Sequence, residues 1–110
     1  MARFSFAPDT ERIGKRQRLP LYRVVLLDDD HHTNLYVIDM LQEIFIFSFE
    51  EARRHAEEVD RAGRTVVITC ELPEAEYSRD LIHSYGPDPR LPQSAGSMSA
   101  VIEPALCGLR

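Results

Sequence analysis

Residues 22–42 read YRVVLLDDDHHTNLYVIDMLQ, and this stretch decides the fold of the chain. Its opening, together with the preceding leucine, is apolar and β-branched, so residues 21–27 predict a strand that is buried in a core. The strand must end at the run Asp28 to Asp30, because three charged side chains in succession cannot continue into a core.

A helix is predicted directly after the acidic run. Thr33 fits its N-cap, since a threonine hydroxyl accepts hydrogen bonds from free backbone N–H groups at a helix start. Apolar side chains then recur at the i, i+3, i+4, i+7 spacing of one buried helix face. These are Val37, Met40, Leu41, Ile44 and Phe45. Aspartates ahead of a helix also suit the positive end of its dipole, so a purely structural role for the acidic run stays open.

A second helix is bounded by clear signals at both ends. Residues 48–51 match a capping box, and Gly63 supplies a left-handed stop after residue 62. Most of its side chains are charged, whereas Ala52, Ala56 and Val59 share the face that is predicted to point inward.

The remaining sequence predicts a strand, a helix and a strand. Residues 64–70 are β-branched and apolar, and Pro73 fits the first turn of a third helix. Residues 86–97 are rich in Pro, Gly and Ser and predict a loop, with a short last strand at residues 98–103. The order is strand, helix, helix, strand, helix, strand, an α+β sandwich in which one face of the sheet is buried.

Length and composition predict one domain. The chain has 110 residues, 44% of them hydrophobic, which is enough for one core and too little for two. We expect a flexible arm at residues 1–20, the domain at 21–104 and a tail at 105–110. The net charge of -5 argues against a nucleic-acid partner. There is no long apolar run and no apolar leader, so we expect no membrane association and a cytoplasmic protein.

The sequence argues against a phosphorylation site, a metal site and a catalytic site. A strand that ends in paired aspartates is typical of phosphate-accepting receiver domains, but that fold also needs a lysine late in the chain, and Lys15 is the only lysine. Adjacent histidines such as His31 and His32 point apart and form a poor metal site. No glycine-rich phosphate cradle or histidine-paired nucleophile occurs. We therefore expect no metal, no cofactor and no catalysis.

The opening stretch resembles the signature of the ClpS family, adaptors of ATP-dependent Clp proteases. That signature is a hydrophobic strand, then Asn-Asp-Asp-Tyr-Thr-Pro-Met, then a helix that begins Phe-Val. Here the helix reads YVIDMLQ at residues 36–42, and the likeness extends over residues 20–103. The resemblance implies a three-stranded antiparallel sheet packed against three helices. It also implies a monomeric, non-enzymatic adaptor that delivers substrates to the N-terminal domain of a ClpA- or ClpC-type AAA+ unfoldase.

ClpS proteins hold the first residue of a substrate in a small pocket, and the resemblance assigns that site to this chain by position. An ammonium group removed from water needs acceptors, and the positions that correspond to them are Asp28, Asp29 and Asp60. The positions that correspond to the pocket are Asp30, His32, Asn34, Ala56, Val59 and Met98.

Several of these positions depart from the family pattern. Asp28 replaces an asparagine, Asp60 a histidine and His32 a threonine, while Asn34 and Ala56 replace methionines that shape the pocket. One interpretation is a more anionic site with altered specificity, towards a basic or polar first residue. The other is a domain that has lost first-residue recognition and serves as a protein–protein interaction module.

The unfoldase-docking surface is assigned only by resemblance. The family uses charged residues near the start of the third helix. An ungapped alignment assigns this role to Glu76, and a shift of two residues assigns it to Glu71 and Glu74. The sequence does not distinguish between these two alignments.

Overall fold

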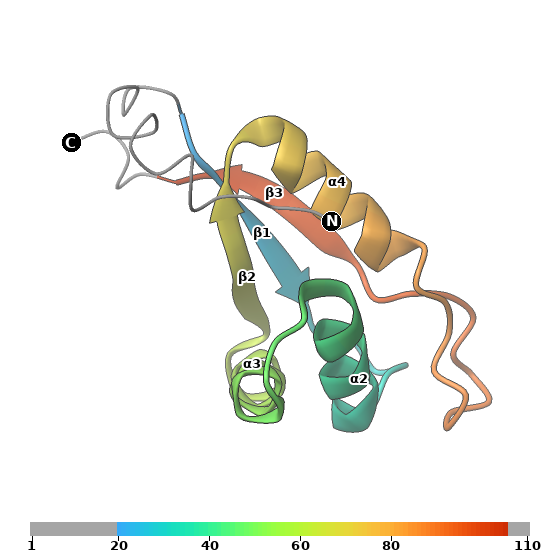
Figure 1. The fold of residues 1–110 in the computed structure, drawn as a ribbon. Helices are drawn as coiled ribbons and strands as arrows, with labels where there is room; N and C mark the ends of the chain where they lie inside the picture. The colour runs from blue at the N-terminus through green and yellow to red at the C-terminus, as the bar shows by residue number, and fades with distance from the viewer. Residues whose placement is uncertain (1–19, 106–110) are drawn as a thin grey trace.

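The computed structural model describes residues 20–105, which contain three strands and three helices (Figure 1). Residues 1–19 of the predicted arm and residues 106–110 of the predicted tail lie outside these residues. The elements, in chain order, are β1 (Tyr22–Leu27), α2 (Asn34–Phe45), α3 (Phe49–Ala62), β2 (Arg64–Cys70), α4 (Leu72–His83) and β3 (Ala100–Pro104).

The three strands form one antiparallel sheet with the order β2-β1-β3. Tyr22 at the start of β1 pairs with Cys70 at the end of β2, and Leu27 at its other end pairs with Arg64. The register shifts between Val24 and Val25, where β2 contributes an extra residue. The predicted α+β class and the predicted order of elements are confirmed.

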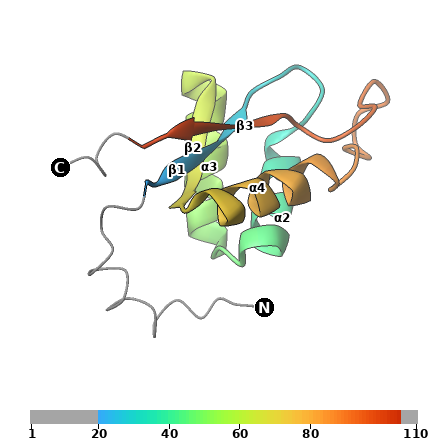
Figure 2. The same cartoon turned by 90° about the horizontal axis from the view of Figure 1, so that it is seen from above.

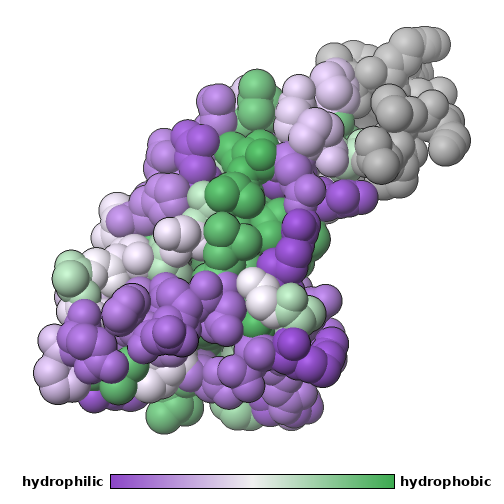
Figure 3. Space-filling view, turned by 180° about the vertical axis from the view of Figure 1, so that it is seen from behind, coloured by the Kyte–Doolittle hydropathy of each residue, from purple (hydrophilic) through white to green (hydrophobic). Residues whose placement is uncertain are grey.

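The helices cover one face of the sheet. Because strand side chains alternate, Val24 and Leu26 point to one face and pack into the core with the helices. Val25 points to the opposite face and pairs there with Val66 and Val101. Figure 2 shows no helix over that face, and Figure 3 shows an apolar strip running along it. Ala56, Val59 and Met98, three of the residues predicted for the pocket, belong to the core between the sheet and the helices.

The helix boundaries follow the predicted caps. Thr33 Oγ1 accepts a hydrogen bond from the Tyr36 backbone N–H at 3.2 Å, which fixes the start of α2. Ser48 and Glu51 form both bonds of a capping box at the start of α3. Gly63 has a φ of 87° and donates its backbone N–H to the Val59 carbonyl, so it ends α3 in the left-handed region that favours glycine.

The last strand begins later than the sequence predicts. It spans Ala100–Pro104 and not residues 98–103, although the Ser99 carbonyl already accepts a hydrogen bond from Leu27 at 3.0 Å. Met98 lies before the strand and is buried in the core. No helix within residues 20–105 is long and apolar enough to cross a membrane.

Candidate functional site

The acidic turn, residues 28–30, follows β1 and is hydrogen-bonded to the residue that ends α3. The Asp28 backbone N–H donates to the Gly63 carbonyl at 3.0 Å, which extends the pairing of β1 with β2 by one residue. This contact brings Asp28 close enough to Asp60, in the last turn of α3, for their charges to interact. Two of the three predicted amine acceptors therefore lie within range of each other's charge although they are far apart in the sequence.

The acidic turn is electrostatically unbalanced. Partial burial raises the pKa of Asp28 above its usual value, the negative charges of Asp60, Asp29 and Asp30 add to this, and a hydrogen bond from the Asp29 backbone opposes it. Within the described residues, Asp28, Asp30 and Asp60 form no ion pair. Such a cluster favours a cation, because an added positive charge relieves the mutual repulsion.

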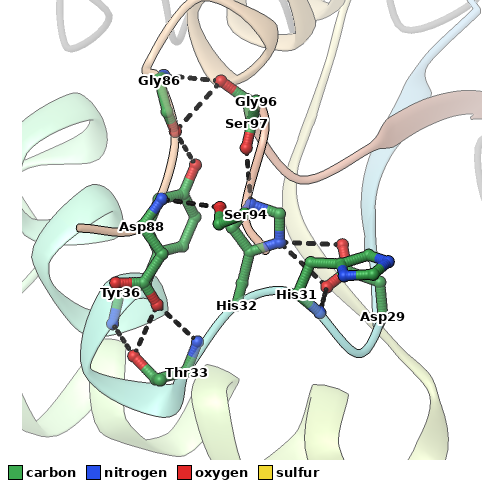
Figure 4. Close-up of polar contacts among 10 residues, drawn as sticks. All are labelled: Asp29, His31, His32, Thr33, Tyr36, Gly86, Asp88, Ser94, Gly96 and Ser97. Atoms are coloured by element: carbon green, nitrogen blue, oxygen red, sulfur yellow. Dashed lines mark hydrogen bonds and ion pairs between the residues drawn. The ribbon is translucent and has the colours of Figure 1, made fainter. Parts of the chain in front are cut away.

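Asp29 differs from its neighbours because it faces a histidine. His32 Nδ1 lies 2.9 Å from each carboxylate oxygen of Asp29, and Asp29 Oδ1 also accepts the His31 backbone N–H at 2.8 Å. The other ring nitrogen, His32 Nε2, lies 2.6 Å from the Gly96 carbonyl oxygen (Figure 4). The His32 side chain is only 4% exposed. The ring also lies against Tyr36, with 4.5 Å between ring centroids.

Other residues predicted for the pocket divide into a buried group and an exposed group. Ala56, Val59 and Met98 are 1%, 1% and 2% exposed and belong to the hydrophobic core. Asp30 and Asn34 are exposed, and Asn34 is the first residue of α2. The buried group is apolar and the exposed group polar. This is the division that a site with an apolar interior and a polar mouth requires.

The loop at residues 86–97 contributes contacts that the sequence did not predict. Asp88 is 1% exposed, and its Oδ2 accepts hydrogen bonds from the Thr33 backbone N–H and hydroxyl at 2.7 and 2.8 Å. Tyr36 donates its hydroxyl to the Gly86 carbonyl at 2.6 Å. The sequence shows Asp88 only as a polar residue between two prolines, and nothing in that pattern indicates a partner 55 positions away.

Charged residues at the start of α4 lie at the other end of the sheet. Glu76 is exposed, and Glu74 is half-buried and close to Cys70. Burial, reinforced by the charges of Glu74 and Glu71, raises the pKa of the Cys70 thiol to about 11. Since Cys70 pairs with the start of β1, the start of α4 lies a full strand length from the acidic turn, as Figures 1 and 2 also show.

No group of three or more metal-binding side chains occurs within the part of the chain that the structure describes. The acidic turn therefore offers carboxylates to a cation such as an ammonium group but no mixed ligand set for a transition metal.

Comparison with known proteins identifies the family. Residues 17–92 match the family of the ATP-dependent Clp protease adaptor protein ClpS. The chain belongs to the ClpS family. A ClpS adapter from Gloeobacter violaceus is 36% identical over 81 residues, which are 67% of this chain and 87% of the relative. ClpS 2 from Agrobacterium fabrum is 37% identical over 62 residues, 56% of this chain and 60% of the relative.

A solved ClpS structure has the same fold. Agrobacterium tumefaciens ClpS2, bound to L-phenylalaninamide, superposes with a TM-score of 0.64 and 28% sequence identity. The match covers 79% of this chain and 99% of that one. As a member of the ClpS family, the protein is an adaptor of the Clp protease system.

Proposed function

We propose that this ClpS-family adaptor binds the N-terminal residue of its substrates and passes them to a ClpA- or ClpC-type AAA+ unfoldase. It acts by binding alone, as a cytoplasmic monomer, and it catalyses no reaction. The α-amino group of the substrate is received by the carboxylates of Asp28, Asp29 and Asp60. The first side chain enters between the acidic turn and the apolar residues Ala56, Val59 and Met98, with Asp30, His32 and Asn34 at the mouth.

The observation that carries this proposal is the convergence of Asp28 and Asp60 at one end of the sheet. Their charges interact, Asp28 has a raised pKa, and no cation is paired with either among residues 20–105. A substrate ammonium supplies that missing charge. The ligand of the related Agrobacterium structure, L-phenylalaninamide, has the same kind of free α-amino group.

We further propose that the specificity of the pocket is altered towards a basic or polar first residue. Two of the family's apolar pocket positions carry Asn34 and Ala56 here, and the family's histidine is Asp60. An arginine or lysine side chain brings a second positive charge to the acidic turn. Its attraction to Asp28, Asp30 and Asp60 exceeds that of an uncharged side chain and weakens as salt is added.

A second candidate is an interaction module that ignores peptide N-termini. It is favoured by the deep burial of Ala56, Val59 and Met98, which already pack with other core side chains. In that case the exposed acids bind a basic surface on a partner protein and the identity of the first residue has no effect.

Fluorescence polarisation with a set of peptides that differ only in the first residue separates these candidates. Each peptide is made with a free and with an acetylated N-terminus. We expect binding that needs the free amine and is strongest for Arg or Lys at the first position. Equal binding of free and acetylated peptides would contradict first-residue recognition. Strongest binding of Phe, Leu, Tyr or Trp peptides would leave recognition standing but contradict the altered specificity.

The role of the acids is tested by Asp29→Asn with Asp80→Asn as the matched control. Removing one partner of a close charge pair costs about 2 kcal/mol or more, so Asp29→Asn should weaken binding of the free-amine peptide by a factor of about 30. Asp80 is an exposed residue of α4 whose side chain, within residues 20–105, pairs only with its neighbour Arg79. Its variant should bind as the unmodified protein does. Equal losses in the two variants would mean that only net charge matters.

A further inference from the structure

Asp88 is a buried charged residue in the loop at residues 86–97 and is separate from the acidic turn. Thr33 donates two hydrogen bonds to its Oδ2, and Arg90 donates its backbone N–H and side chain to Oδ1 at 3.0 and 3.2 Å. Arg90 also forms an ion pair with Asp39 of α2 at 2.8 Å. A carboxylate removed from water is costly unless such donors surround it, and here they come from the loop and from α2. Asp88 therefore fastens the loop to the first turn of α2.

The two ends of the same loop meet neighbouring residues of that turn. Tyr36 donates its hydroxyl to the Gly86 carbonyl, and His32 Nε2 faces the Gly96 carbonyl (Figure 4). Inside the loop, the Asp88 backbone N–H donates to Ser94 Oγ at 2.8 Å. The end of the loop thus contacts His32 through Gly96, while Asp88 is hydrogen-bonded to the next residue, Thr33.

The contacts of His32 give each of its ring nitrogens an acceptor. A carbonyl oxygen faces Nε2 and carboxylate oxygens face Nδ1, so whichever ring nitrogen carries a hydrogen has an acceptor to receive it. The ring also packs against Tyr36, with 4.5 Å between the ring centroids and a tilt of 44° between the ring planes. The His32 ring in turn holds the Asp29 carboxylate in one orientation, through the contact of Nδ1 with both of its oxygens.

We propose that Asp88 is a positioning residue for the amine site: by anchoring the loop at residues 86–97 to α2 it holds the Gly96 carbonyl against His32, and His32 fixes the carboxylate of Asp29. This inference rests on the proposed function, in which Asp29 receives the substrate's amine. It gives the loop a role in binding that acts through His32 and Asp29. Preorganisation of this kind strengthens binding because the acceptor need not be ordered when the ligand arrives.

The first readout requires no substrate. Long-range proton–nitrogen NMR of the imidazole rings at neutral pH reports which ring nitrogens carry hydrogen, and His32→Gln identifies the signals of His32. We expect the ring-nitrogen signals of His32 to shift in Asp88→Asn, because the Gly96 carbonyl is then no longer held against Nε2. Asp80→Asn, which removes an exposed charge from α4, should leave the His32 signals unchanged. Identical His32 signals in Asp88→Asn and the unmodified protein would overturn the proposal.

The second readout is peptide affinity. If the ordered loop falls to a tenth of the molecules in Asp88→Asn, the dissociation constant of the free-amine peptide rises about tenfold. Unchanged affinity in a protein that does discriminate free from acetylated peptides would overturn the positioning role. If the unmodified protein shows no such discrimination, the proposed function fails, and the NMR result still decides whether Asp88 positions His32.

A second pair of variants keeps the proposal testable if Asp88→Asn does not fold. Thr33→Pro removes both donors from Thr33 while Asp88 keeps its charge, and Thr33→Ser retains both donors. We expect Thr33→Pro to reproduce the changed His32 signals and Thr33→Ser to match the unmodified protein. Unchanged signals in folded Thr33→Pro would show that the Thr33–Asp88 contact does not hold His32 in place.

Discussion

At the scale of single residues, Asp28, which we propose as an acceptor for the substrate's amine, lowers the stability of the fold. Its pKa is raised, first by burial and then by the charges of Asp60, Asp29 and Asp30. A group with a raised pKa is less favourable in its charged form in the folded protein than in the unfolded chain. At neutral pH, where Asp28 is ionised, the folded state is therefore destabilised.

Asp28→Asn should raise the thermal unfolding temperature at neutral pH and low salt. The substitution removes one charge from a repelling cluster and keeps the shape of the side chain. Added salt should reduce the difference from the unmodified protein, because it screens the same repulsion. The variant should also lose part of any preference for a basic first residue in the peptide assay. A lower unfolding temperature at neutral pH would mean that the Asp28 charge has a stabilising partner.

Sequence reasoning at this scale succeeded where the partners are close along the chain. The hydroxyls of Thr33 and Ser48 cap their helices as predicted, because such bonds reach only three residues ahead. It did not indicate the partners of His32 and Asp88, since Gly96 and Thr33 lie 64 and 55 positions away. Contacts over such separations depend on how the loop packs, which no local pattern records.

At the scale of elements, the loop at residues 86–97 is held more firmly than its composition suggests. Glycine, proline and serine predict a loop and say nothing of its order. Burial alone would raise the pKa of Asp88, but backbone hydrogen bonds from Thr33 and Arg90 and further bonds from their side chains outweigh it and lower the pKa to about 2. The anchored loop is therefore an acid-sensitive element.

The sign of this pH dependence follows from the lowered pKa of Asp88. Its hydrogen bonds stabilise the fold fully above the unfolded-state pKa near 3.8 and are lost as the pH falls through about 2. Over that range the shift corresponds to about 2 kcal/mol of stability. Urea unfolding of the unmodified protein and Asp88→Asn should differ by about this much above pH 5 and converge towards pH 2. A difference that does not change with pH would mean that the charge of Asp88 contributes nothing.

At the scale of the whole molecule, the sheet separates two surfaces. The order of elements could be predicted because hydrophobic periods of two and 3.6 residues alternate clearly along the chain. The β1–β2 register then places the acidic turn beyond Leu27 and the start of α4 beyond Cys70, at opposite ends of a six-residue strand. At about 3.3 Å per residue, the strand alone separates them by roughly 20 Å.

This separation predicts that substrate binding and unfoldase docking can be lost independently. Glu76→Gln or Glu74→Gln should weaken binding of a ClpA- or ClpC-type N-terminal domain in calorimetry and leave free-amine peptide affinity unchanged. Asp29→Asn should do the reverse. Glu57→Gln, the same change on the exposed surface of α3, serves as the control for lost charge. The variant that loses docking also decides between the two alignments of α4, because they assign the role to different glutamates. A single variant that loses both activities without unfolding would contradict the separation, since the two partners would then contact one surface.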